Sequence, residues 1–301
     1  MSGQRLHALW RKALEDPLSL PLRVWGHYRR ALREVYRNTL DHPLRFPLTL
    51  RHYYFFDQVF EVPSEGAPAL ASSEIWDKLR IQHRHFYQAD ERETWLRSFS
   101  EPKDGQESSL KVRATEIAKL LRSRKITNVH SVGVGCAGLE YHLKHEMPSL
   151  HLTASEFAPV NVERLRKVFH ECDQIVLFDI GTADWASLQS HDSTNRLVLM
   201  NRVDPCFANS QWKAVFKRMA DSGLRQILFI PDTVLTLRYI GMLRSRRREA
   251  KLTARPLTFT GFVRTDRVFR SLWCGAYRCE PIVVDNARAY WLTAPKSRLT
   301  A

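Results

Sequence analysis

Three glycines, Gly133, Gly135 and Gly138, form the stretch of this sequence with the clearest chemical use. Their G-x-G-x-x-G spacing follows a β-forming run at 129–132 and precedes a helix-forming segment. Glycine has no Cβ, so the backbone can turn sharply there and come close to a ligand. The pattern therefore predicts the turn at which a parallel α/β sheet binds a nucleotide-like molecule.

A carboxylate, Glu156, follows at the end of the next expected strand. One carboxylate can accept hydrogen bonds from both hydroxyls of a ribose. A dinucleotide such as NAD(P) would use it in this way, with its pyrophosphate on the helix N-terminus. S-adenosylmethionine would use the same carboxylate, so Glu156 alone leaves an oxidoreductase and a methyltransferase open.

At four places the sequence resembles the class I S-adenosylmethionine-dependent methyltransferases, over roughly residues 108 to 295. These places are the loop 133–138, the turn 155–159, the stretch 178–180 and a terminal hairpin. The resemblance implies a Rossmann-like enzyme with S-adenosylmethionine as its cofactor. With Asn201 at the expected end of the fourth strand, the predicted cofactor-binding residues are Gly133, Val134, Gly135, Gly138, Glu156, Phe157, Asp179, Ile180 and Asn201.

The resemblance also assigns parts of the cofactor to these residues. Methionine and ribose would lie on the glycine loop, the ribose hydroxyls on Glu156, and adenine between Phe157 and the stretch 179–180. Two positions depart from the family pattern: Ser131 stands where an acidic residue is usual, and Ala137 where a third glycine is usual. These departures affect the end of the site that would bind the ammonium group, and they motivate an alternative, a non-catalytic cofactor-binding module.

Asp204 is the candidate catalytic residue, because open α/β sheets place their ligands at the carboxyl ends of the strands. It begins the sequence D-P-C-F, which resembles the D/N-P-P-Y/F signature of methyltransferases acting on exocyclic or amide nitrogens. That resemblance gives an alternative function, methylation of a nucleic-acid base. An Asp-Pro pair also starts many turns, which is the simpler explanation. No histidine falls at the expected strand ends, so no histidine base is expected.

A basic segment lies between the fifth strand and the terminal hairpin, and its centre is Arg246, Arg247 and Arg248. Guanidinium groups suit phosphate and carboxylate, so these three are candidate substrate-binding residues for an anionic acceptor. A basic helix that only faces solvent would show the same run of arginines. The main prediction is methyl transfer to an oxygen or nitrogen of a small-molecule or glycan-type acceptor.

The net charge is +14, from 46 Lys and Arg against 32 Asp and Glu. Such a charge favours an acidic partner, so contacts with nucleic acid or an anionic membrane stay open. A basic amphipathic helix expected over 22–40 fits either membrane contact or packing on the main domain. Five cysteines without a C-x-x-C pair argue against a disulfide framework and a zinc site, and favour a reducing, cytoplasmic location without a bound metal.

The order of elements predicts an α/β fold with a doubly wound, mostly parallel sheet that ends in an antiparallel hairpin. A mainly helical N-terminal extension, with a possible role as a substrate lid, is predicted for residues 1–105 and the Rossmann-like domain for 106–301. The expected helices are 109–125, 138–146, 160–170, 211–222 and 264–272. The expected strands are 129–132, 151–157, 174–178, 196–200, 226–231, 277–284 and 289–293, the last two joined at 285–286.

Overall fold

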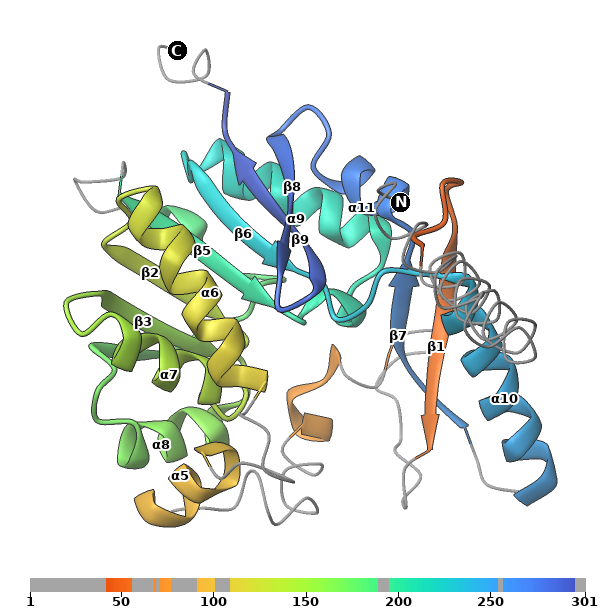
Figure 1. Cartoon of the computed structure of the whole chain (residues 1–301), viewed down its shortest axis with the longest axis horizontal. Coiled ribbons are helices and arrows are strands. Elements are labelled where there is room, and N and C mark those ends of the chain that lie inside the picture. The colour runs from red at the N-terminus through yellow and green to blue at the C-terminus, as the bar shows by residue number, and fades with distance from the viewer. Residues whose placement is uncertain are drawn as a thin grey trace, which may run out of the picture.

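The computed structural model describes residues 42–55, 68, 71–76, 91–100, 109–188, 195–253 and 257–295. The predicted basic helix over 22–40 lies outside these ranges. A seven-stranded sheet covered by helices makes up most of the described chain (Figure 1). Its strands, in spatial order, are β4 (Gln174–Leu177), β3 (His151–Glu156), β2 (Asn128–Val132), β5 (Arg196–Asn201), β6 (Gln226–Ile230), β9 (Ala287–Thr293) and β8 (Arg278–Val284).

Strands β2 to β6 run parallel, and β9 is antiparallel to both of its neighbours. The turn between β8 and β9 lies at Asp285 and Asn286, with φ angles of 50° and 56°. Two left-handed residues in a two-residue loop match the twist of a hairpin, and Asp and Asn tolerate that conformation. The predicted α/β fold and its terminal antiparallel hairpin are confirmed.

Helices cover both faces of the sheet, so its central strands β2, β5 and β6 are buried along most of their length. One face packs on α6 (Ser109–Ser123), α7 (Gly138–Glu146) and α8 (Pro159–Val168), with α5 (Arg92–Ser100) beyond them. The other face packs on η2 (Trp185–Leu188), α9 (Asn209–Asp221) and α11 (Asp266–Leu272). The sheet therefore separates two apolar cores, and the loops after the parallel strands build its carboxyl edge.

A second sheet of two strands lies beside the carboxyl ends of the large sheet (Figure 1). It pairs β1 (Thr49–Phe55) with β7 (Leu257–Arg264) in antiparallel fashion, and α10 (Leu237–Thr253) packs against β1. We call the two-stranded sheet of β1 and β7 the ribbon. Neither strand was predicted, and the expected helix from residue 264 begins at Asp266 instead. The pairing joins residues on both sides of the domain boundary placed near 105, which itself stays a prediction.

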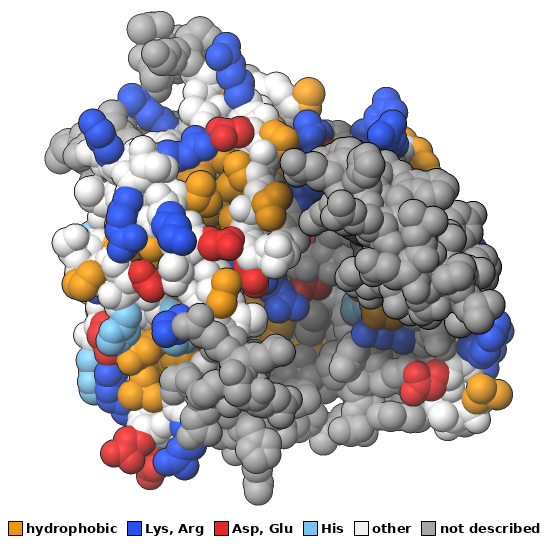
Figure 2. All heavy atoms as spheres, in the orientation of Figure 1, with side chains coloured by type: hydrophobic (Ala, Val, Ile, Leu, Met, Phe, Trp, Pro, Cys, Tyr) orange, Lys and Arg blue, Asp and Glu red, His pale blue; other side chains and the backbone are white. Residues whose placement is uncertain are grey.

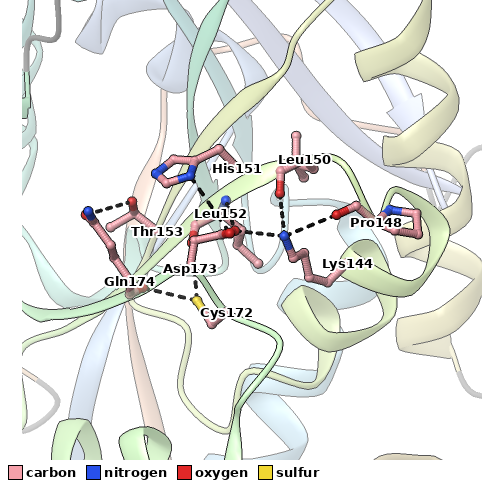
Figure 3. Close-up of polar contacts among 9 residues, drawn as sticks. All are labelled: Lys144, Pro148, Leu150, His151, Leu152, Thr153, Cys172, Asp173 and Gln174. Carbon is pink, nitrogen blue, oxygen red and sulfur yellow. Dashed lines mark hydrogen bonds and ion pairs between the residues drawn. The ribbon is translucent and has the colours of Figure 1, made fainter.

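The opposite, amino-terminal edge of β3 and β4 is fixed by Lys144 of α7 (Figure 3). Its ammonium group donates to the carbonyl of Leu150 at 2.6 Å and to the carboxylate of Asp173 at 2.8 Å. The same Asp173 oxygen accepts the N–H of Leu152 at 2.8 Å. These contacts tie α7 to β3 and to the turn before β4, so this end of the sheet is closed by structural hydrogen bonds.

Candidate cofactor and acceptor site

The glycine loop joins β2 to α7 in a tight turn. Gly133 and Gly135 have φ angles of 70° and 59°, and Ala137 is also left-handed at 59°. A Cβ at Gly133 would lie 2.6 Å from Cγ1 of Val203. Both the conformation and the contact require glycine at 133, because the loop after β5 packs directly on it.

The N–H groups of the loop are already used within the protein. Gly133 and Val134 both donate to the carbonyl of Ser155, at 2.8 and 3.2 Å, and Gly135 donates to Oε2 of Glu156 at 2.9 Å. From α8, Asn161 donates to the carbonyl of Gly135 at 2.6 Å. The loop is therefore braced against the end of β3 before any ligand arrives, and these three N–H groups do not point at a shared anion.

Glu156 lies at the end of β3, as predicted, and is 2% exposed. Its second oxygen, Oε1, accepts the N–H of Phe157 at 2.9 Å. A carboxylate oxygen can accept more than one hydrogen bond. The structure thus holds a carboxylate in a fixed orientation between the glycine loop and the turn that follows β3.

A second carboxylate, Glu140 of α7, lies buried below the same loop. Its Oε1 accepts a hydrogen bond from the hydroxyl of Ser131 at 2.6 Å. Burial raises the pKa of Glu140 to about 7, and the nearby charge of Glu156 adds to that effect. The helix after the loop thus brings a buried carboxyl group next to Ser131. The sequence signal, a Glu two residues after Gly138, is too common to have identified it.

The structure places the other predicted cofactor residues in different surroundings. Gly138 is buried, and a Cβ on it would lie 3.0 Å from Phe99 and from Leu110, so this glycine serves helix packing. Ile180 is 7% exposed and belongs to the core on the other face of the sheet. Neither Gly138 nor Ile180 faces the open part of the loop, where residues 133–135 are half-exposed.

Asp179 is exposed and caps its own turn. Its carboxylate accepts the N–H of Gly181 at 2.7 Å and the hydroxyl of Thr182 at 3.0 Å. Asn201 ends β5, and its Oδ1 accepts from Arg113 of α6 at 3.3 Å. Both residues stand at the carboxyl edge of the sheet, as predicted, and both have protein partners there.

Asp204 lies at the same edge but is 1% exposed. Its Oδ1 accepts the N–H of Asp232, which follows β6, at 2.6 Å, and its buried Oδ2 has no hydrogen-bond partner. Burial raises the pKa of Asp204 to about 7, and the charge of Asp232 acts in the same direction. The carboxyl group has a pKa suited to proton transfer, yet it lies beneath the surface of the edge.

The ribbon packs on the D-P-C-F segment and bonds to its backbone carbonyls. Arg264 of β7 is fully buried and donates to the carbonyl of Asp204 at 2.8 Å and to the carbonyl of Phe207. The carbonyl of Pro205 faces Gly261 of β7. The groups that the D/N-P-P-Y/F resemblance would offer to an amino group are thus covered, and the segment does not present the predicted base-binding arrangement.

The three predicted substrate arginines differ in direction. Arg246 is half-buried, and its Nη1 lies 2.8 Å from Nε2 of His52. Arg247 is exposed and lies over the ring of Tyr53 at 5.5 Å from its centroid, and Arg248 is exposed. Of these three, Arg246 is the one with a contact to a histidine among the described residues.

His52 is a candidate functional residue that the sequence analysis missed. The sequence analysis considered only the ends of the parallel strands, which hold no histidine, whereas His52 lies on β1, paired with Gly261, which packs on Pro205 after β5. Figure 2 shows acidic and basic side chains together where the surface is hollowed between the large sheet and the ribbon. No local signal marks His52, since its position depends on a strand pairing with residues about 200 positions away.

Two further findings concern the described ranges alone. Within them no group of three or more His, Cys, Asp or Glu side chains is arranged to hold a metal ion. None of the helices there combines the length and the apolar character that crossing a bilayer requires.

No protein-family model matches the sequence, and no curated protein matches it. The structure is similar to human N-acetylserotonin methyltransferase in complex with SAM (14% identity, 73% of this chain and 65% of that chain, TM-score 0.45). It is similar to the S-adenosylmethionine-dependent methyltransferase SibL, with 17% identity over 61% of this chain and 55% of that chain and a TM-score of 0.44. It is also similar to a proposed Zn-dependent alcohol dehydrogenase from Rhodobacter sphaeroides, with 12% identity over 76% of this chain and 98% of that chain and a TM-score of 0.49.

The chain thus spans less than two thirds of the length of those two methyltransferases. These likenesses concern the fold alone. The strand order, with its antiparallel β9 between β6 and β8, gives the Rossmann-like α/β fold that the resemblance to class I methyltransferases implied.

Proposed function

We propose that this protein transfers a methyl group from S-adenosylmethionine to an oxygen or nitrogen of a small, anionic acceptor, glycan-type acceptors included. One observation carries the proposal: the N–H of Gly135 in the glycine loop donates to the carboxylate of Glu156, with Glu140 buried beneath. The carboxylate of Glu156 beside the loop favours a ligand with positive charge. A pyrophosphate would meet this negative charge and find the N–H groups of Gly133 and Val134 already bonded to Ser155.

The residues present fit the proposed cofactor. Glu156, held by its bonds to Gly135 and Phe157, would accept from the ribose hydroxyls, and the half-exposed backbone of 133–135 would bind the methionine end. When bound, S-adenosylmethionine would supply a methyl group on a positively charged sulfur. The chain's own contribution is to hold that group at the carboxyl edge in line with an acceptor and to keep water away.

The acceptor side of the proposal rests on the ribbon and α10. Helix α10 contains six Lys or Arg residues and one Glu, so its field favours an anion. Arg246 turns toward the edge, and Arg202, after β5, is paired with Asp232 at 2.5 Å. A carboxylate or phosphate on the acceptor would find guanidinium groups close to the strand ends.

Isothermal titration with S-adenosylhomocysteine, NAD and NADP tests the proposal. We expect S-adenosylhomocysteine alone to bind, and Glu156→Gln to weaken it by about 10- to 100-fold, because a hydrogen bond to a charged group contributes roughly 1.5–3 kcal/mol. Glu163→Gln, an exposed position on α8, is the matched control and should bind like the wild type. Binding of a nicotinamide nucleotide alone, or of none of the three, would refute the proposal.

A further inference from the structure

His52 and Arg246 form a contact between the ribbon and α10 that fixes the protonation state of the imidazole. Arg246 Nη1 lies 2.8 Å from His52 Nε2, and His52 Nδ1 lies 2.8 Å from Oγ1 of Thr260. A guanidinium can only donate, so Nε2 is the acceptor and the ring proton is on Nδ1. The Thr260 hydroxyl accepts that proton and donates to the carbonyl of His52 at 3.3 Å. Arg246 therefore covers the basic lone pair of a neutral histidine.

The position of His52 follows from a short chain of contacts at the carboxyl edge. In the ribbon His52 is paired with Gly261, and Gly261 packs on the carbonyl of Pro205. Two residues before Pro205, Val203 packs on Gly133 of the glycine loop. The ribbon at His52 is thus linked, through the loop after β5, to the edge that carries the proposed cofactor loop.

The charged and titratable groups around His52 come from two other elements. Arg246 and Tyr239 face it from α10, the Tyr239 ring at 6.1 Å between centroids, and Asp232 acts on it from the turn after β6. Burial and the charge of Arg246 lower the pKa of His52, while Asp232 raises it. Without a ligand the imidazole is therefore neutral at pH 7 and a weak base.

We propose, as an extension of the proposed function, that His52 is the proton acceptor of the reaction and that an anionic group on the acceptor uncovers it by drawing Arg246 away. The acceptor would then carry a carboxylate or phosphate next to the hydroxyl that is methylated. As the hydroxyl oxygen bonds to the methyl carbon, the carbon–sulfur bond breaks and leaves a neutral sulfide. The hydroxyl proton moves to Nε2 of His52 and later to water. Moving the guanidinium also brings the pKa of His52 nearer to the working pH, where a general base is most effective.

Imidazole NMR on ¹⁵N-histidine-labelled full-length protein tests this proposal without a known acceptor. His52 is one of 12 histidines and is assigned by the signal that His52→Gln removes. The titration of His52 is followed alone, with benzoate, with inorganic phosphate, and with benzyl alcohol as the uncharged probe. We expect benzoate or phosphate to raise the pKa of His52 by about one unit, because an anion replaces a cation beside the ring. Benzyl alcohol should leave it unchanged.

Arg246→Gln is compared with Arg267→Gln, a change at an exposed position on α11 outside the proposed site. In Arg246→Gln the pKa of His52 should be higher before any probe is added and should no longer respond to anions. Arg267→Gln should respond like the wild type. A His52 pKa that no anion changes, or that responds equally in Arg246→Gln, would overturn the proposal. The titration needs no cofactor, so a protein with the anion response that fails to bind S-adenosylhomocysteine would refute the proposed function alone.

Discussion

The carbonyl of Pro205 and the backbone of Gly261 are in direct contact, and a Cβ at 261 would lie 2.7 Å from the Pro205 carbonyl carbon. Gly261 has a φ of 155°, which other residues rarely adopt. This contact joins the ribbon to the loop after β5. The acceptor half of the proposed site would therefore depend on this contact.

Gly261→Ala should therefore destabilise the protein strongly. Neither the backbone of Pro205 nor the φ angle can adjust cheaply, and we expect a loss of more than about 2 kcal/mol. Urea unfolding measures the effect. Gly241→Ala in α10 is the control, because a Cβ there meets nothing within 4 Å. Alanine is favoured over glycine inside a helix, so this change should stabilise the protein by roughly 0.5–1 kcal/mol. Equal effects of the two substitutions would contradict the contact.

Arg264 is expected to hold the closed D-P-C-F segment through its charge and its hydrogen bonds together. It donates to Asn209 at 2.7 Å and to the carbonyls of Asp204 and Phe207. Arg264→Met leaves these acceptors buried without a donor, at about 1–3 kcal/mol each. We expect a total loss of about 3 kcal/mol or more by urea unfolding. Exposed Arg267→Met on α11 should stay within about 0.5 kcal/mol of the wild type.

The raised pKa of Glu140 gives the stability a definite pH dependence. Between about pH 4.5 and 7 the folded protein holds a proton on Glu140 that the unfolded chain has released. The folded state then binds more protons, so this group's stabilisation is complete below that window and is lost as the pH rises to 7. Asp204 acts in the same direction.

Glu140→Gln isolates this contribution, because an amide keeps the acceptor for Ser131 and cannot ionise. The stability of the variant relative to the wild type should rise from pH 5 to pH 8, as followed by urea unfolding at each pH. A relative stability that falls over this range would show that the carboxylate, and not the carboxylic acid, is the favoured form in the fold.

The main sheet could be predicted from the sequence because its signals are local. Short apolar runs alternate with amphipathic segments, and the pair Asp285 and Asn286 marks the hairpin within a few residues. The loop glycines and Glu156 also stand beside recognisable strands, so their positions at the carboxyl edge followed from the order of elements alone.

The ribbon could not be predicted in this way. Its register pairs His52 with Gly261, and no spacing rule connects two strands so far apart in the chain. The roles of His52 and Arg264 depend on that pairing. Glu140 was missed for a different reason: whether a helical glutamate faces solvent or Ser131 depends on the packing of α7 on β2, which a single sequence does not specify.

Gly133 offers a test that separates space from backbone conformation in the cofactor loop. Gly133→Ala would bring a Cβ to 2.6 Å from Cγ1 of Val203 and would also force alanine to a φ of 70°. We expect it to abolish measurable binding of S-adenosylhomocysteine, because the loop must move.

Adding Val203→Ala removes the clashing methyl group and leaves the nearest remaining atom, Cβ of Val203, at 3.8 Å. The left-handed conformation still costs roughly 1–2 kcal/mol, so the double variant should bind about 5- to 30-fold more weakly than the wild type. Val203→Ala alone should bind nearly normally, and a double variant no better than Gly133→Ala would show that the methyl contact does not limit the loop.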